Sequence, residues 1–157
     1  MALTVYVETS IVSYLTATPS RDLIMAAHQQ ATHDWWENHR PFFDLVVSQL
    51  VLQEAGQGDS DSSKRRLEVL KEIKLLPIPE EAADLAQRVT RAGILAPEDL
   101  EDALHISIAT VYGIDCLLTW NFKHMANLTI EKRIAALTRS LGFEMPAICT
   151  PLELIGE

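Results

Sequence analysis

The sequence predicts a three-layer α/β fold, in which a short and mostly parallel central sheet is flanked by helices. The expected strands are short and apolar, as strands covered on both faces must be. The connections between them are long and helical, and parallel strands require such connections. The expected order is one strand, two helices, a second strand, four helices, a third strand, one helix and a last strand.

Four segments have the composition of strands, because β-branched and other apolar residues gather in them between turn-forming residues. They are residues 3–7, 42–47, 115–120 and 147–150. The stretch 75–79 contains two prolines and is expected to be a short extended connector.

Seven segments carry apolar residues at helical spacing and are expected to be helices. They are residues 11–15, 21–39, 49–55, 64–73, 80–92, 98–112 and 129–141. We expect Thr9 or Ser10 to cap the first, Ser20 the second and Ser48 the third, since hydroxyl side chains satisfy free N–H groups at helix starts. Residues 58–63 are polar and are expected to form a hinge.

Length and composition indicate a single folded domain over residues 1–157. The apolar share is 48% and the charged share 22%, as in ordinary globular proteins. No apolar run is long enough to span a membrane, and residues 1–7 do not resemble a secretory signal. We therefore expect a cytoplasmic protein in which Cys116 and Cys149 are reduced core thiols.

The charge balance excludes one way of binding nucleic acid. The chain has 13 Lys+Arg and 22 Asp+Glu, a net charge of −9, whereas proteins that bind nucleic acid through bulk charge carry a basic surface. An acidic nucleic-acid enzyme is still expected to work where its acids hold a divalent cation.

Polar residues follow the predicted strands at the sheet edge where parallel α/β proteins bind ligands. Glu8 follows the first strand, Glu54 lies on the helix after the second, and Thr119 and Asn121 follow the third. The helix that precedes the third strand runs antiparallel to it, so the start of that helix, with Asp99 and Asp102, is expected at the same edge.

Acids brought together from distant segments repel one another unless a cation lies between them. Mg²⁺ and Mn²⁺ take oxygen ligands and would resolve this conflict. Such a site suits metal-assisted hydrolysis of phosphodiesters.

Structural explanations exist for most of these acids. Glu8 could be a solvated turn residue and Glu54 a surface charge, and acids in the first turn of a helix are favoured by the helix dipole whatever the function. Asp102 differs, because it lies further inside an apolar helix and shares a face with Asp99 and His105. This arrangement favours a functional site.

Taken in order, these segments resemble a PIN domain. The resemblance rests on five stretches that together span nearly the whole chain. They are 5–15 (VYVETSIVSYL), 48–54 (SQLVLQE), 102–109 (DALHISIA), 117–124 (LLTWNFKH) and 150–154 (TPLEL).

The resemblance implies a Mg²⁺- or Mn²⁺-dependent ribonuclease with an RNA substrate. Many small single-domain members of the family are toxins of toxin–antitoxin pairs, similar to VapC-type proteins, which implies an antitoxin partner and a homodimer. Glu8, Glu54 and Asp102 would then be the metal-binding acids and Asn121 the fourth ligand. The supporting residues would be Ser10, Asp99, His105, Thr119 and Lys123.

Two positions depart from the family pattern, which has Asp where this chain has Glu8 and Asn121. Because Asn ligates through a neutral carbonyl, a second metal should bind more weakly. A catalytically weak protein that binds RNA or a partner is the alternative. A nucleotide-binding domain is disfavoured, because no glycine-rich loop follows the first strand.

Overall fold

The computed structural model describes residues 2–156. Its centre is a five-stranded sheet in which every neighbouring pair is parallel, in the order β3-β2-β1-β4-β5. The strands are β1 (Thr4–Val7), β2 (Asp44–Ser48), β3 (Lys74–Leu76), β4 (Cys116–Leu118) and β5 (Ala147–Cys149).

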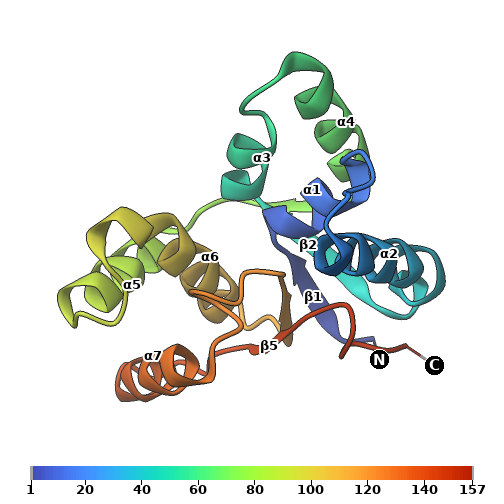
Figure 1. Ribbon diagram of the computed structural model, residues 1–157. Coiled ribbons are helices and arrows are strands. Elements are labelled where there is room, and N and C mark those ends of the chain that lie inside the picture. The colour runs from blue at the N-terminus through green and yellow to red at the C-terminus, as the bar shows by residue number, and fades with distance from the viewer. Residues whose placement is uncertain (1, 157) are drawn as a thin grey trace.

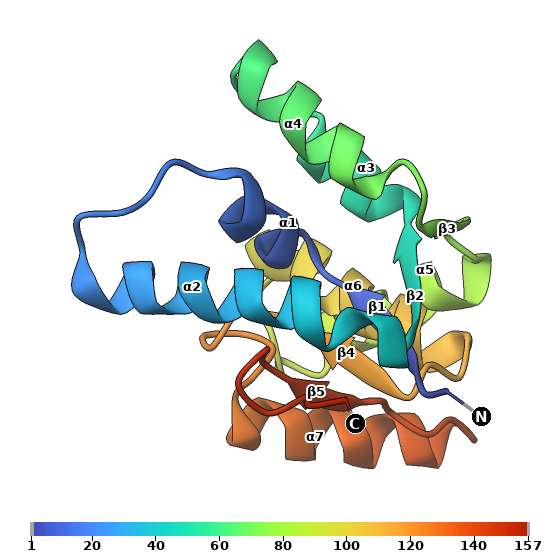
Figure 2. The same ribbon diagram turned by 90° about the vertical axis from the view of Figure 1, so that its right-hand side faces the viewer.

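Helices cover both faces of this sheet (Figures 1 and 2). One layer consists of α1 (Thr9–Thr16), α2 (Leu23–Asn38), α3 (Gln49–Ala55) and α4 (Ser60–Leu70). The other consists of α5 (Glu80–Arg91), α6 (Leu100–Val111) and α7 (Leu128–Ser140). Short 3₁₀ turns, η1 (Arg40–Phe42) and η2 (Pro97–Asp99), lead into β2 and α6. The predicted three-layer α/β fold is therefore confirmed.

The direction in which the chain adds strands to the sheet reverses at the central strand β1. The chain runs outward from β1 to β2 and β3, and then crosses back to β4 and β5 on the other side. Val5, Tyr6 and Val7 are fully buried, as expected for a strand with neighbours on both sides and helices on both faces. In α/β sheets ligands bind at such a switch point, outside the carboxyl ends of the two diverging strands, here β1 and β4, and we call this position the crevice.

Two expectations about strands were wrong. Residues 42 and 43 precede β2, because Pro41 lies in the 3₁₀ turn η1. Lys74–Leu76 is a fifth strand rather than part of a connector, and it pairs with β2 through Val46↔Lys74 and Ser48↔Leu76. It is a three-residue edge strand followed at once by Pro77, too short for a periodic pattern.

Several helix starts also differ from expectation. Asp22 caps α2 through Met25 N, and Asp59 caps α4 through Ser62 N, so α4 begins at Ser60, inside the expected hinge. Ser48 caps α3 as predicted. Pro97 begins a separate 3₁₀ turn before α6. In α2 and α4 a nearby aspartate accepts from the free N–H groups in place of the expected start.

The two ends of the described chain meet beside the start of β2 (Figure 1). Leu3 O accepts from Asp44 N at 2.9 Å. Leu154 O accepts from Trp35 Nε1 at 2.6 Å, and a Cβ at Gly156 would lie 2.5 Å from Phe42 Cβ. Both ends are therefore tied to the amino end of the sheet. Within residues 2–156, no helix is long and apolar enough to cross a membrane.

Candidate active site

Glu8 lies at the crevice between β1 and β4, with 6% of its surface exposed. Its Oε2 accepts from Ser10 N at 3.1 Å, so Glu8 itself caps α1, and the expected cap by Thr9 or Ser10 was wrong. Its Oε1 accepts from Ser10 Oγ and from Thr119 Oγ1, each at 2.5 Å. The side chain folds back onto its own helix, and three donors from two segments fix the carboxylate.

Glu54 lies on the last turn of α3 and meets two donors. Thr9 Oγ1 donates to its Oε1 at 2.5 Å, and His105 Nε2 lies 2.7 Å from the same oxygen. Burial raises the pKa of Glu54, but hydrogen bonds from His105 and Thr9 and the charge of His105 outweigh it, so the pKa falls below its ordinary value. Glu54 is held as a carboxylate.

Ligand atoms of Glu8, Glu54 and His105 all lie within 4.8 Å of one another. These residues come from the end of β1, the end of α3 and the middle of α6. The crevice therefore brings together two of the three acids predicted to bind metal.

The third predicted acid, Asp102, belongs to a neighbouring group. His124 Nδ1 lies 2.7 Å from Asp102 Oδ2, and His124 Nε2 lies 3.4 Å from Asp99 Oδ2. Ligand atoms of this second group also lie within 4.8 Å of one another. Among residues 2–156, Glu8, Glu54 and Asp102 do not form one group of this kind. Their assignment to a shared metal site stays a prediction.

The segment after β4 supplies the other predicted positions. Thr119 is buried and binds Glu8, while Asn121 Oδ1 accepts from His124 N at 3.0 Å and so caps the turn that carries His124. Lys123 is exposed in that turn. Asn121 therefore has a structural partner, and a role as fourth ligand stays a prediction.

Four contributors were absent from the sequence-based site: Tyr6, Thr9, Ser48 and Glu101. Thr9 and Glu101 flank predicted acids, and this proximity was the only available signal. Tyr6 and Ser48 are fully buried and have the sequence pattern of core and cap residues. His124 was also outside the predicted site, and it links Asp99 to Asp102.

The chemistry of the crevice fits a divalent cation. A hydrogen bond to Glu54, which only a protonated Glu101 can donate, raises the pKa of Glu101 above its ordinary value, and burial and the charge of Glu54 add to the effect. Acids that retain protons in this way lack a counter-ion. His105 Nε2 already faces Glu54, so the carboxylate oxygens of Glu8 and Glu54 are the atoms that would hold a divalent cation here.

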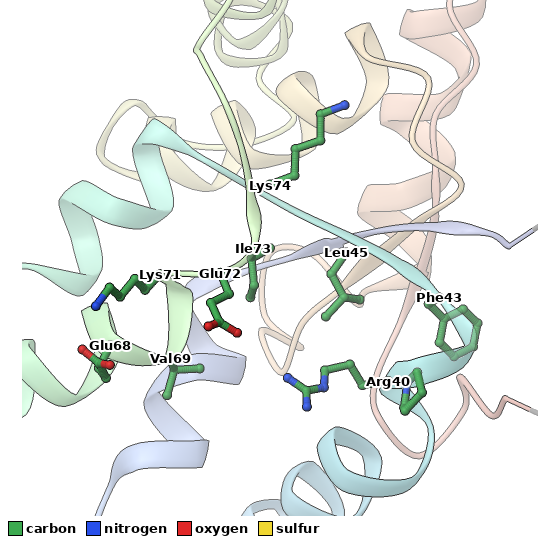
Figure 3. A pocket seen from close by; sticks show the side chains of 10 residues that line it. Arg40, Phe43, Leu45, Glu68, Val69, Lys71, Glu72, Ile73 and Lys74 are labelled. Atoms are coloured by element: carbon green, nitrogen blue, oxygen red, sulfur yellow. The ribbon is translucent and has the colours of Figure 1, made fainter.

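A pocket of about 790 Å³ lies elsewhere, between η1, β2 and the end of α4 (Figure 3). Arg40 and Glu72 point toward it, and Lys74 points away. Leu45 and Ile73 also line it, near the amino ends of β2 and β3. None of the predicted site residues contributes to its wall.

Comparison with known families gives a match to the PIN domain over residues 5–127. The chain belongs to the PIN domain family. The predicted resemblance is confirmed, and membership supports a nuclease function at the level of the family. The closing stretch 150–154 lies outside the matched residues.

Solved structures share the fold of this PIN domain at 14% identity. VapBC-1 from nontypeable Haemophilus influenzae matches with a TM-score of 0.58, over 96% of this chain and 100% of that chain. VapBC2 from Rickettsia felis, bound to a promoter DNA fragment, gives 0.56 over 94% and 98%. VapC20 of Mycobacterium tuberculosis, a sarcin-ricin loop cleaving toxin, gives 0.55 over 76% and 91%. A search of curated proteins gave no match.

Proposed function

We propose that this PIN domain is a Mg²⁺- or Mn²⁺-dependent endoribonuclease. The observation that carries the proposal is the meeting of the Glu8 and Glu54 carboxylates with His105, within 4.8 Å, in the crevice between β1 and β4. Acids that approach this closely favour a cation, and a phosphodiester is the substrate class that such a cation serves.

In this proposal the acids have distinct roles. Glu8 and Glu54 hold the cation, and Ser10 and Thr119 fix the Glu8 carboxylate through their hydroxyl groups. Asp102 and Asp99 line the adjoining position, with Asn121 as a neutral neighbour. A bound divalent cation supplies Lewis acidity, because it lowers the pKa of a water and offsets charge on phosphate oxygens.

Lys123 places a positive charge beside this acidic crevice. It is exposed in the turn that also carries Asn121 and His124. An exposed lysine beside an acidic site suits a phosphate of the RNA backbone, since phosphate contacts position nucleic acid without reading its sequence. We therefore assign Lys123 to substrate binding.

The test is cleavage of a labelled, structured RNA by the purified protein in Mn²⁺, followed on a denaturing gel. We expect cleavage by wild type, its loss in EDTA, and its loss in Asp102→Ala. Asp84→Asn is the matched control, because it removes an acid exposed on α5 and should cleave normally. Cleavage that persists in Asp102→Ala would contradict the assignment.

The alternative is a PIN domain that binds RNA or a protein partner with little catalysis. Its support is the replacement of the family's usual aspartates by Glu8 and Asn121. RNA binding without cleavage at any Mn²⁺ concentration, with the matched control equally inactive, would favour it.

We further propose that the protein is the toxin of a type II toxin–antitoxin pair, acts in the cytoplasm and forms a homodimer. Two structural neighbours are VapBC structures, which supports an antitoxin partner. Leu23 and Ile24, 86% and 71% exposed at the start of α2, offer apolar surface to a protein. Growth arrest on expression, relieved by the product of an adjacent reading frame, tests the pair, and light scattering tests the dimer.

A further inference from the structure

A buried chain of hydrogen bonds connects the two ends of α3 behind the candidate site. Ser48 Oγ lies 2.7 Å from Tyr6 Oη, Tyr6 Oη lies 2.7 Å from His105 Nδ1, and His105 Nε2 lies 2.7 Å from Glu54 Oε1. Ser48, Tyr6 and His105 are each 0% exposed. Only Glu54, at 19%, reaches solvent.

The direction of the last bond is fixed by chemistry. A carboxylate only accepts hydrogen bonds, so His105 Nε2 must carry a hydrogen whether the imidazole is neutral or charged. Thr9 Oγ1 also donates to Oε1 of Glu54. Both donors therefore bind one oxygen, Oε1, and neither of them binds Oε2.

The helix that carries Glu54 needs this support. It has seven residues, and isolated helices of this length are not stable in water. Ser48 accepts from Val51 N at 3.3 Å and caps its first turn, while Glu54 lies on its last turn. Both ends of α3 are thus joined to the same pair, Tyr6 on β1 and His105 on α6.

We infer that His105 and Tyr6 are positioning residues, which set the orientation of α3 and hold the Glu54 carboxylate through Oε1 in position for the metal. The inference rests on the proposed function, since it concerns the metal site of that nuclease. It differs from a core-packing role in one respect: the contact to Glu54, rather than the bulk of the ring, carries the effect. Groups that orient a metal ligand typically alter affinity 10–100-fold when removed.

Two isosteric substitutions separate these roles. The amide nitrogen of Gln occupies the place of histidine Nε2, so His105→Gln keeps the donor to Glu54 and loses the contact to Tyr6. The amide of Asn occupies the place of Nδ1, so His105→Asn keeps the contact to Tyr6 and loses the donor to Glu54. Both remove the buried ring, and both should lower the melting temperature in EDTA by similar amounts.

The measurement is calorimetric titration of each full-length protein with Mn²⁺, beside its melting curve in EDTA. We expect His105→Gln, which loses only the Tyr6 contact, to bind Mn²⁺ several-fold more weakly than wild type, and His105→Asn, which loses the donor to Glu54, at least about tenfold more weakly than His105→Gln. Equal Mn²⁺ affinities in the two variants would overturn the inference. Wild type that binds no Mn²⁺ would overturn the proposed function as well, so the two failures are distinguishable.

Tyr6→Phe is a second test of the positioning role, and it leaves the aromatic ring in place. It deletes only the hydroxyl between Ser48 and His105, and we expect Mn²⁺ affinity to fall several-fold with the fold intact. The matched control is Tyr112→Phe, which deletes a hydroxyl that donates to Pro77 O at 2.7 Å, on a residue outside the predicted site. An unchanged Mn²⁺ affinity in Tyr6→Phe would contradict the inference, even if the His105 variants failed to fold.

Discussion

The two groups of acids at the carboxyl edge of the sheet are held in different ways. Glu8 and Glu54 accept hydrogen bonds from hydroxyl, backbone and imidazole donors on several elements. In the other group, Asp99 and Asp102 both bind His124, and these side chains are 17–25% exposed. The first group is held by donors from several elements, while the contacts of the second run through one histidine. Geometry fixed by the fold suits a ligand site that must exist before substrate arrives.

The sharpest way to break this comparison is to remove one acid from each group. Glu8→Ala deletes the cap of α1 and leaves the Ser10 and Thr119 hydroxyls without their acceptor, so we expect a loss of about 2–3 kcal/mol in the free energy of unfolding. Asp102→Asn relieves repulsion with Asp99 and should melt at or above the wild-type temperature. Urea unfolding and thermal melts in EDTA measure both. A clear loss in Asp102→Asn with none in Glu8→Ala would reverse the comparison.

The buried pair also predicts how stability depends on pH in EDTA. The pKa of Glu54 is lowered from 4.5, so its contribution is present above pH 4.5 and is lost as the pH falls through the folded-state value. For His105, burial lowers the pKa, but the hydrogen bond to Glu54 and the surrounding acids raise it above 6.5 overall. Its contribution is therefore present below pH 6.5 and is lost as the pH rises through the folded-state value.

We thus expect this pair to stabilise the fold most between pH 4.5 and 6.5. Urea midpoints across the pH range measure it. His105→Gln should abolish the decline on the alkaline side, while the exposed His33→Gln should keep it. An unchanged alkaline decline in His105→Gln would assign it to another group.

Asn121 offers a smaller test at the border of the two groups. Asn121→Ala removes the cap on His124 N and should cost about 0.5–1 kcal/mol of stability, whereas Asn121→Asp keeps an acceptor there. If Asn121 is also the neutral fourth ligand, Asp should tighten Mn²⁺ binding and Ala should weaken it, about 1.4 kcal/mol for each tenfold change. Calorimetric titration separates the roles, and equal affinities in all three proteins would leave Asn121 as a cap alone.

Glu101→Gln should give the smallest change. Glu54 raises the pKa of Glu101 above its ordinary value of 4.5. At pH values above 4.5, ionisation of Glu101 therefore costs more in the folded state than in the unfolded chain. The neutral amide should therefore melt slightly higher at neutral pH in EDTA, and it should bind Mn²⁺ less tightly because a carboxylate is lost. A lower melting temperature would mean that Glu101 is structural.

The parallel sheet could be predicted because four of its strands are apolar runs joined by segments with helical periodicity. Strand β3 could not be predicted, because a three-residue edge strand is too short to show a periodic pattern. Glu8 and Glu54 could be placed from their positions after strands. The residues that hold these two acids in place could not be predicted. Tyr6 has the alternation of a core strand residue, and Glu101 lies in a helix turn that favours acids in any protein. Glu8 as a cap was missed because Ser, Thr, Asp and Asn are the usual capping residues.

Both ends of the described chain lie at the start of β2, at the edge of the sheet opposite the candidate site. The reactive edge lies where the strands finish, while Leu3 and Gly156 lie beside Asp44 and Phe42, where β2 begins. A tag, fluorophore or surface linker attached through either terminus is therefore expected to leave the crevice clear. Gly156 must be retained in such fusions, since any larger residue would strike the Phe42 ring.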